Sequence, residues 1–271
     1  MFINKILCIL IIAYTLMGVS NSIPFPADFK AIDIASDGFG GFYLLDDFGQ
    51  VIALDSTGQI RAELEDDALS MEIIHISDIA LSVGWLYLAD REGMAIFITD
   101  RNLRLPTRIS LNLTGVKLRP DKIAVSTDGR ILIYDAGKNE FYLFQDWRDT
   151  NPRQFLIPEL KRVDKINSLG FDRVTKRFNI TTSEAVYIYS LYGQPISTIH
   201  FTDVESPLGA FSGSDGFYII GKKSAITIVD GIQKPMEFEA EVSAVIQNIS
   251  GRMVLLYGNK IICVESLLKI E

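Results

Sequence analysis

A repeating pattern of apolar and polar positions runs along the chain. Each of the first three copies begins with alternating apolar and polar residues, which are followed by a turn. A short apolar run comes next, and an aspartate ends the copy. These copies occupy residues 33–46, 78–90 and 122–135, and their final aspartates are 44 and 45 residues apart. A period of about 40–50 residues built from short strands is typical of a β-propeller.

Three weaker copies of the pattern follow, beginning near Asn167, Leu208 and Ala244. Six copies over residues 23–271 give about 41 residues each, which suits one four-stranded blade. The continuous apolar runs are typical of strands that are covered on both faces by neighbouring blades. The pattern therefore predicts an all-β protein, a six-bladed β-propeller of four-stranded antiparallel blades.

The pattern leaves the closure of the ring open. The sixth copy has three clear strands, and the segment 267–270 is a short candidate for its fourth. At the other end of the domain, residues 26–30 have no strand partner of their own. We expect one terminal segment to complete the ring, because closure removes the edge strands that promote aggregation.

The first 22 residues have the organisation of a signal peptide. Lys5 precedes an almost wholly apolar run, 6–17, and small residues follow at Gly18, Ser20 and Ser22. This run is shorter than the roughly 20 residues that span a bilayer, so we expect no stable membrane span after cleavage; an uncleaved anchor is the alternative. The sequence thus predicts a signal peptide (1–22), a single propeller domain (23–271) and a secreted or periplasmic protein.

Cysteine content and charge limit the internal cross-links and the classes of partner that this chain can have. Without the leader Cys263 is the sole cysteine, so the exported domain has no internal disulfide. The chain carries 34 acidic against 26 basic residues, a net charge of −8, and no dense basic run. This balance argues against a nucleic-acid partner.

Two phrases resemble the NHL-type six-bladed propellers, whose repeats combine a glycine-containing turn, an apolar strand and a terminal aspartate. They are residues 87–90 after Gly84, and residues 133–135 after the turn at 128–129. The resemblance covers the first three copies well and the last three weakly. It implies the architecture and no particular activity.

Two sets of polar residues are candidates for chemistry. The recurrent Asp46, Asp90 and Asp135 are best interpreted as turn caps, since an aspartate at a strand end can accept backbone hydrogen bonds. The residues that begin the innermost strands can instead converge on the channel, where polar groups form ligand sites. We expect a binding site at the channel mouth formed by Asp33, Asp78, Asp121, Lys122 and Asn167, with Ser243 nearby.

No catalytic residue, metal ligand or cofactor motif stands out: there is no Gly-x-Ser-x-Gly elbow and no zinc-binding signature. The sequence favours a non-enzymatic binding or scaffold module for a protein or glycan partner in the cell envelope or outside the cell. Aromatic residues near expected turns, Phe48, Trp147 and Tyr192, fit this interpretation. The alternative is a metal-assisted hydrolase of the lactonase-like propeller type that uses the channel-mouth carboxylates, although Lys122 would repel a cation there.

Overall fold

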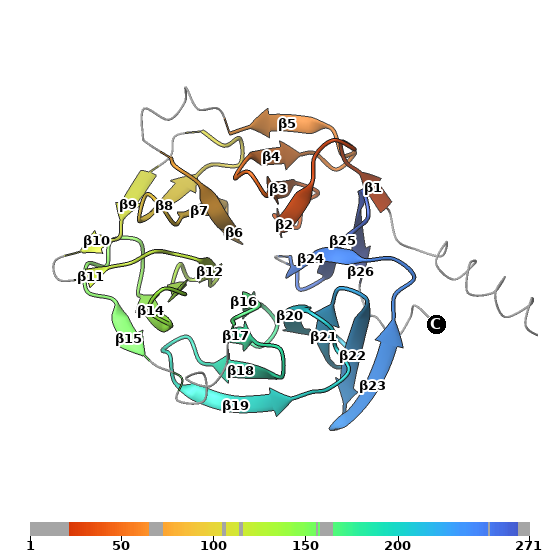
Figure 1. Cartoon of the computed structure of the whole chain (residues 1–271). Coiled ribbons are helices and arrows are strands. Elements are labelled where there is room, and N and C mark those ends of the chain that lie inside the picture. The colour runs from red at the N-terminus through yellow and green to blue at the C-terminus, as the bar shows by residue number, and fades with distance from the viewer. Residues whose placement is uncertain are drawn as a thin grey trace, which may run out of the picture.

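The computed structural model describes residues 22–64, 73–104, 107–113, 116–155, 157, 165–248 and 250–264. Within these ranges there is no helix, and six four-stranded antiparallel sheets surround a central axis (Figure 1). The fold is a six-bladed β-propeller, which confirms the predicted class and number of blades. No helix in the described part of the chain has the length and apolar character needed to cross a membrane.

The strands of each blade are given from the innermost to the outermost. Blade 1 comprises β2 (Ala31–Ser36), β3 (Phe42–Asp46), β4 (Val51–Leu54) and β5 (Ile60–Glu63). Blade 2 comprises β6 (Ile76–Ser82), β7 (Trp85–Asp90), β8 (Ala95–Thr99) and β9 (Thr107–Ser110). Blade 3 comprises β12 (Lys122–Val125), β13 (Ile131–Asp135), β14 (Glu140–Phe144) and β15 (Arg153–Phe155).

Blades 4 to 6 continue the same order. Blade 4 comprises β16 (Ser168–Asp172), β17 (Arg177–Thr181), β18 (Ala185–Tyr189) and β19 (Pro195–His200). Blade 5 comprises β20 (Pro207–Ser212), β21 (Phe217–Gly221), β22 (Ser224–Val229) and β23 (Ile232–Glu237). Blade 6 comprises β24 (Val242–Gln247), β25 (Met253–Tyr257), β26 (Lys260–Val264) and β1 (Ser22–Pro24). A small hairpin of β10 (Asn112–Leu113) and β11 (Val116–Lys117) connects blades 2 and 3.

The N-terminal strand closes the ring. β1 pairs antiparallel with β26, with Ser22 opposite Ile262, and supplies the outermost strand of blade 6 (Figure 1). Closure therefore uses residues just before the expected segment 26–30, while the alternative segment 267–270 lies outside the described residues. Ser22, the last residue of the predicted signal peptide, already belongs to this strand, and residues 1–21 also lie outside the described residues.

The blades are held together by apolar packing between neighbours. Six clusters of buried side chains fill the six interfaces between consecutive blades, including the interface between blades 6 and 1. Tyr43 and Leu45 of β3, for example, pack with Leu88 and Phe97 of blade 2. The second strands β3 and β13 are buried along their whole length, as their continuous apolar runs predict.

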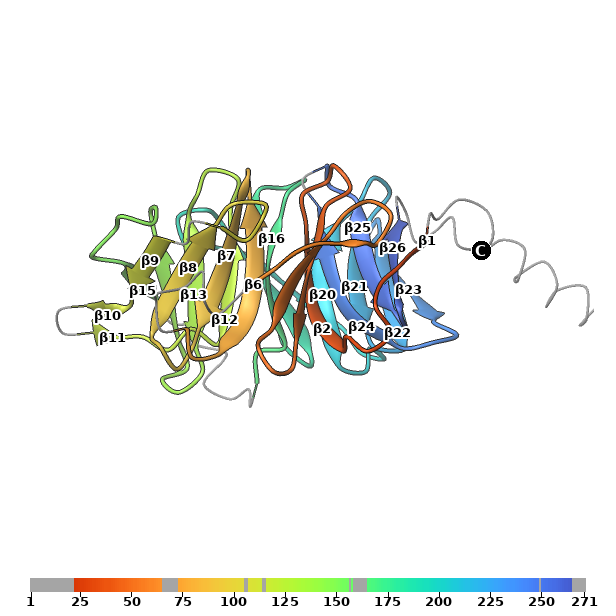
Figure 2. The same cartoon turned by 90° about the horizontal axis from the view of Figure 1, so that it is seen from above.

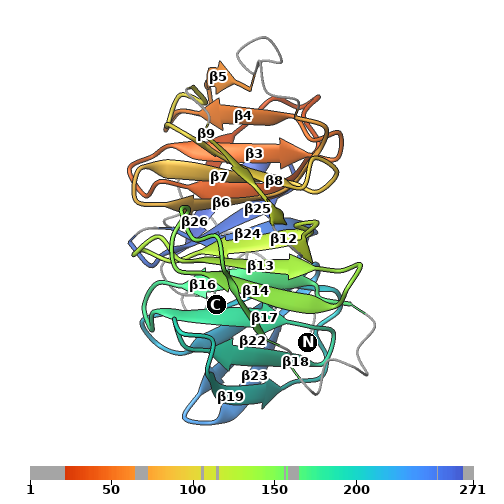
Figure 3. The same ribbon diagram turned by 90° about the vertical axis from the view of Figure 1, so that its left-hand side faces the viewer.

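The disc has two different ends, visible edge-on in Figures 2 and 3. The register aligns Ser36, Phe42, Leu54 and Ile60 across blade 1, so the turns between first and second strands and between third and fourth strands share one end. We call this end the turn face. The other end, where the innermost strands begin and second strands turn into third strands, is the mouth face.

Candidate functional site

Three ionisable side chains converge in the channel from three consecutive blades. Asp33 on β2, Asp78 on β6 and Lys122 on β12 occupy equivalent register positions and line a central cavity of about 160 Å³. The Nζ of Lys122 lies 3.5 Å from Oδ1 of Asp78. We call this group the ion cluster.

The two carboxylates also connect the blades. The backbone N–H of Ile79 in blade 2 donates to Oδ2 of Asp33 at 3.2 Å, and that of Ile123 in blade 3 donates to Oδ2 of Asp78 at 2.7 Å. Asp33 receives a further bond from Ile34 N–H at 2.8 Å. Each aspartate thus ties the mouth end of its innermost strand to the next one around the ring.

Burial changes the proton affinities within the ion cluster. It raises the pKa of Asp33 to about 8, with a further increase from Asp78 and a decrease from Lys122. Burial also raises the pKa of Asp78, opposed by Lys122 and by hydrogen bonds, one of them from Asp33. The pKa of Lys122 rises chiefly because of Asp78. Near neutral pH the aspartates therefore share a proton, and the cluster contains an acid O–H, a carboxylate and an ammonium group.

Among the described residues, the opposite half of the channel carries no charged side chain at the level of the ion cluster. The register positions equivalent to the ion cluster are Ser168 in blade 4, Gly209 in blade 5 and Ala244 in blade 6. The charged groups at this level of the cavity therefore lie on blades 1–3. The lining residues of blades 4–6 include the apolar Leu169, Phe171 and Phe211.

Four of the five predicted site residues line the cavity: Asp33, Asp78, Lys122 and Asn167. The Asn167 side chain forms no hydrogen bond with a described residue. Ser168 and Ser243 line the same cavity. Ser168 is absent from the predicted set, although it directly follows Asn167 at the start of an innermost strand and the same rule would have found it.

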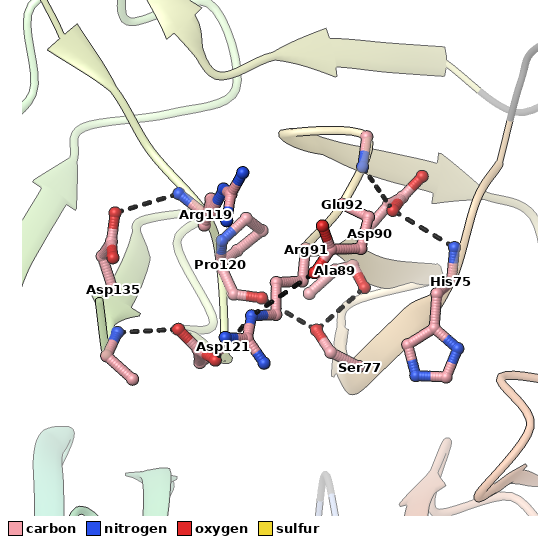
Figure 4. Close-up of polar contacts among 12 residues, drawn as sticks. His75, Ser77, Ala89, Asp90, Arg91, Glu92, Arg119, Pro120, Asp121 and Asp135 are labelled. Carbon is pink, nitrogen blue, oxygen red and sulfur yellow. Dashed lines mark hydrogen bonds and ion pairs between the residues drawn. The ribbon is translucent and has the colours of Figure 1, made fainter. Parts of the chain in front are cut away.

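Asp121, the fifth predicted residue, lies outside the cavity lining. Its Oδ1 is 3.1 Å from Nε of Arg91, and its Oδ2 accepts the N–H of Ala136 at 2.7 Å (Figure 4). Arg91 belongs to blade 2 and Asp121 leads into blade 3, so this ion pair joins neighbouring blades at the mouth face. The Ser77 hydroxyl adds a contact across the same gap by donating to the Pro120 carbonyl at 2.8 Å.

The recurrent aspartates cap the connections beside them, as expected. Asp90 accepts the N–H groups of Ile74 and Gly93 at 2.9 and 2.8 Å, and Asp135 accepts those of Arg119 and Lys138 at 3.0 and 3.2 Å. Figure 4 shows the Asp135 contact with Arg119. Asp90 and Asp135 therefore bind both their own turns and the segments that enter the same blades, whereas among the described residues Asp46 binds only its own turn, at Phe48 and Gln50.

An arginine closes the channel at the turn face. The Arg173 guanidinium extends from blade 4, donating from Nη2 to the Leu81 carbonyl of blade 2 and from Nε to the Gln247 carbonyl of blade 6 at 3.3 Å. Burial lowers the pKa of Arg173 to about 10. Nothing in the sequence predicts this contact, because an arginine in a turn normally points to solvent. These bonds cross the channel at the turn face and join blades 2, 4 and 6.

The metal-dependent alternative gains no support from the geometry. Among the described residues, no group of three or more His, Cys, Asp and Glu side chains has an arrangement that could hold a metal ion. Lys122 also places a positive charge beside the carboxylates.

The fold resembles several solved structures, while the sequence matches no family model and no curated protein. A Bacteroides thetaiotaomicron protein of unknown function aligns with a TM-score of 0.64 at 15% identity, over 89% of this chain and 72% of that one. Streptogramin B lyase aligns with a TM-score of 0.60 at 12% identity, over 90% and 96% of the two chains. A chain of the nidogen/laminin complex aligns with a TM-score of 0.58 at 15% identity, over 76% and 78%. At these identities the likeness establishes the propeller architecture alone, the level at which the NHL-type resemblance was drawn.

Proposed function

We propose that this protein is an exported binding module that holds a glycan at the mouth of its channel, in the cell envelope or outside the cell. The observation that carries the proposal is the convergence of Asp33, Asp78 and Lys122 in one cavity. Buried ionisable groups with raised pKa values are costly for a fold and are concentrated at functional sites. A concave site with few convergent polar groups is the usual form of a ligand pocket.

The chemistry of the cavity favours hydroxyl groups over ions. The shared proton gives the aspartates both donor and acceptor capacity, Lys122 adds donors, and Asn167 offers an amide with both. The two carboxyl groups and the ammonium nearly cancel in charge while they share the proton, so neither a cation nor an anion gains a strong advantage. A sugar ring has hydroxyls at its edge, which match these polar groups, and C–H groups on its faces, which match apolar lining residues such as Leu169 and Phe171.

Structural neighbours support a binding role without specifying it. One neighbour comes from a complex between nidogen and laminin, and another is a lyase for streptogramin B. Propellers of this shape therefore serve both recognition and catalysis. We favour recognition here, because the carboxylates of the ion cluster already accept backbone hydrogen bonds from the neighbouring blades.

The test is binding to an array of neutral and acidic oligosaccharides, with wild type compared with Lys122→Met. This variant removes the ammonium but keeps most of the apolar stem. Lys222→Met is the matched control, since Lys222 pairs with Glu241 at 3.1 Å in blade 5 and does not line the cavity. We expect Lys122→Met to weaken binding at least about tenfold and Lys222→Met to leave it unchanged.

Two outcomes would contradict the proposal. The first is that the wild type binds no oligosaccharide on the array. The second is that Lys122→Met and Lys222→Met bind the oligosaccharides equally well. If cross-linking in the native envelope instead recovers a protein that Lys122→Met releases, the mouth binds a protein and the glycan assignment is wrong.

A further inference from the structure

The turn face, opposite the channel mouth, carries a group of exposed aromatic side chains. Phe39, Trp85, Trp147 and Tyr192 are 75%, 51%, 40% and 57% exposed and lie at turns of blades 1, 2, 3 and 4. Of the strongly exposed aromatic residues in the described chain, Phe48 alone lies on the mouth face. Exposed aromatic groups clustered at one end of a protein are typical of an interaction surface.

Arginines stack on three of these rings. The guanidinium carbon of Arg101 lies 5.4 Å from the Phe39 ring centre and joins blades 2 and 1. The corresponding distances are 4.7 Å for Arg130 over Tyr192, which joins blades 3 and 4, and 4.5 Å for Arg148 over Trp147. These stacks restrain the rings before any partner arrives, which reduces the entropy lost on binding.

The acidic side chains of this surface are hydrogen-bonded within their own turns. The acids of the same turns are engaged locally: Asp100 accepts the N–H groups of Asn102 and Arg104, each at 2.8 Å, and Asp146 accepts that of Arg148 at 2.7 Å. Their turns therefore use these carboxylates as caps.

Arg101 and Arg148, by contrast, form no ion pair with a described residue, although the whole chain carries a net charge of −8. Arg101 and Arg148 lie among exposed aromatic rings. Together these groups complement a partner surface that carries both acidic and apolar side chains. Such a partner gains charge-assisted hydrogen bonds to the guanidinium groups and apolar contact with the rings.

We propose that the turn face of blades 1–4, formed by these aromatic and arginine residues, docks an acidic segment of a partner protein that also carries apolar side chains. Tryptophan, tyrosine and arginine dominate the binding energy of protein interfaces, and here they alternate across four blades. Arg173 separates this surface from the channel, so docking here is independent of ligand binding at the mouth face.

The test is selection of a displayed library of random linear peptides on the full-length protein. We expect the selected peptides to be enriched in Asp or Glu together with aromatic or aliphatic residues. Synthetic copies should bind Trp147→Ala and Arg101→Gln at least about tenfold more weakly than wild type, and added salt should weaken them further. Both substitutions lie in exposed turns, and unchanged denaturation midpoints will show that the variants fold.

Phe48→Ala is the matched control, because Phe48 is 81% exposed but lies on the mouth face. Peptide affinity should be the same as for wild type. The proposal is overturned if no acidic set is enriched or if the peptides bind both turn-face variants as tightly as wild type. It is also overturned if Trp147→Ala dissociates a dimer seen by light scattering, which would identify a second copy as the occupant, or if it abolishes binding to the oligosaccharide array.

Discussion

The Asp78 carboxylate of blade 2 accepts the backbone N–H of Ile123 in blade 3, with Oδ2 and N 2.7 Å apart. One blade earlier, Asp33 and Ile79 form the same contact. These bonds join the mouth ends of three consecutive innermost strands, where the apolar clusters between the blades give way to the channel. The side chains that give the cavity its polarity therefore also contribute to the stability of the ring.

Removing the Asp78 side chain should destabilise the protein strongly. In Asp78→Ala the Ile123 N–H and the Lys122 ammonium both lose their partner in a buried site, and we expect unfolding to be easier by about 3 kcal/mol. Asp78→Asn keeps an oxygen acceptor for Ile123 and should lose less than half as much. Chemical denaturation of the two variants measures both values. Equal losses would show that the charge of Asp78 matters and its hydrogen bond to Ile123 does not.

Much of the ring could be predicted from the sequence because a repeated period fixes the number of blades and the order of their strands. The convergence of Asp33, Asp78, Lys122 and Asn167 follows from one further fact, that the first strand of a blade lies innermost. The hydrogen bonds that Asp33 and Asp78 accept from the next blade could not be predicted. They depend on the stagger between blades, which side-chain packing decides.

Other contacts were beyond sequence reasoning for the same reason. The cap at Asp135 was expected from its own turn, but its bond to Arg119 depends on the path of the incoming connection. The bonds from Arg173 to blades 2 and 6 join segments far apart in the chain. The separation of Phe48 from Trp147 and Tyr192 was accessible, since Phe48 follows a second strand and the other two follow third strands. Counting strand direction would have placed them at opposite ends.

The shared proton of the aspartates predicts a dependence of stability on pH. The pKa of Asp33 is about 8 in the folded protein, and an unfolded aspartate titrates at about 4. Between these values the unfolded chain binds fewer protons than the folded one, so the free energy of unfolding falls as pH rises. We expect this decline to run from about pH 4 to about pH 8 and to level off above it.

Two variants isolate the contribution of the aspartates to this decline. Asp33→Asn has no titrating proton at this position. The free energy of unfolding of this variant should therefore decline less steeply with pH than that of wild type, even if the variant is less stable at every pH. Lys122→Met should extend the decline to higher pH, because Lys122 lowers the pKa of Asp33. Denaturation midpoints measured across the pH range test both expectations. A slope in Asp33→Asn as steep as in wild type would assign the dependence to other groups.

The ring closure can be tested at a glycine. Gly58 has φ +86° in the turn between β4 and β5, and a Cβ there would lie 1.8 Å from the carbonyl oxygen of Pro24 in the closing strand β1. Gly84 has nearly the same conformation, φ +83°, but its Cβ would meet nothing within 4 Å. Both alanine variants therefore carry the same backbone strain, and only Gly58→Ala displaces β1.

We expect Gly84→Ala to cost about 1 kcal/mol, as for other residues held at positive φ. Gly58→Ala should cost roughly 1–3 kcal/mol more, because the closing strand must move from β26. Chemical denaturation gives the two losses, and amide hydrogen exchange should rise along β26 in Gly58→Ala alone, since its outer edge loses its partner. If both variants lose the same stability and protect β26 equally, the pairing of β1 with β26 does not hold the ring closed.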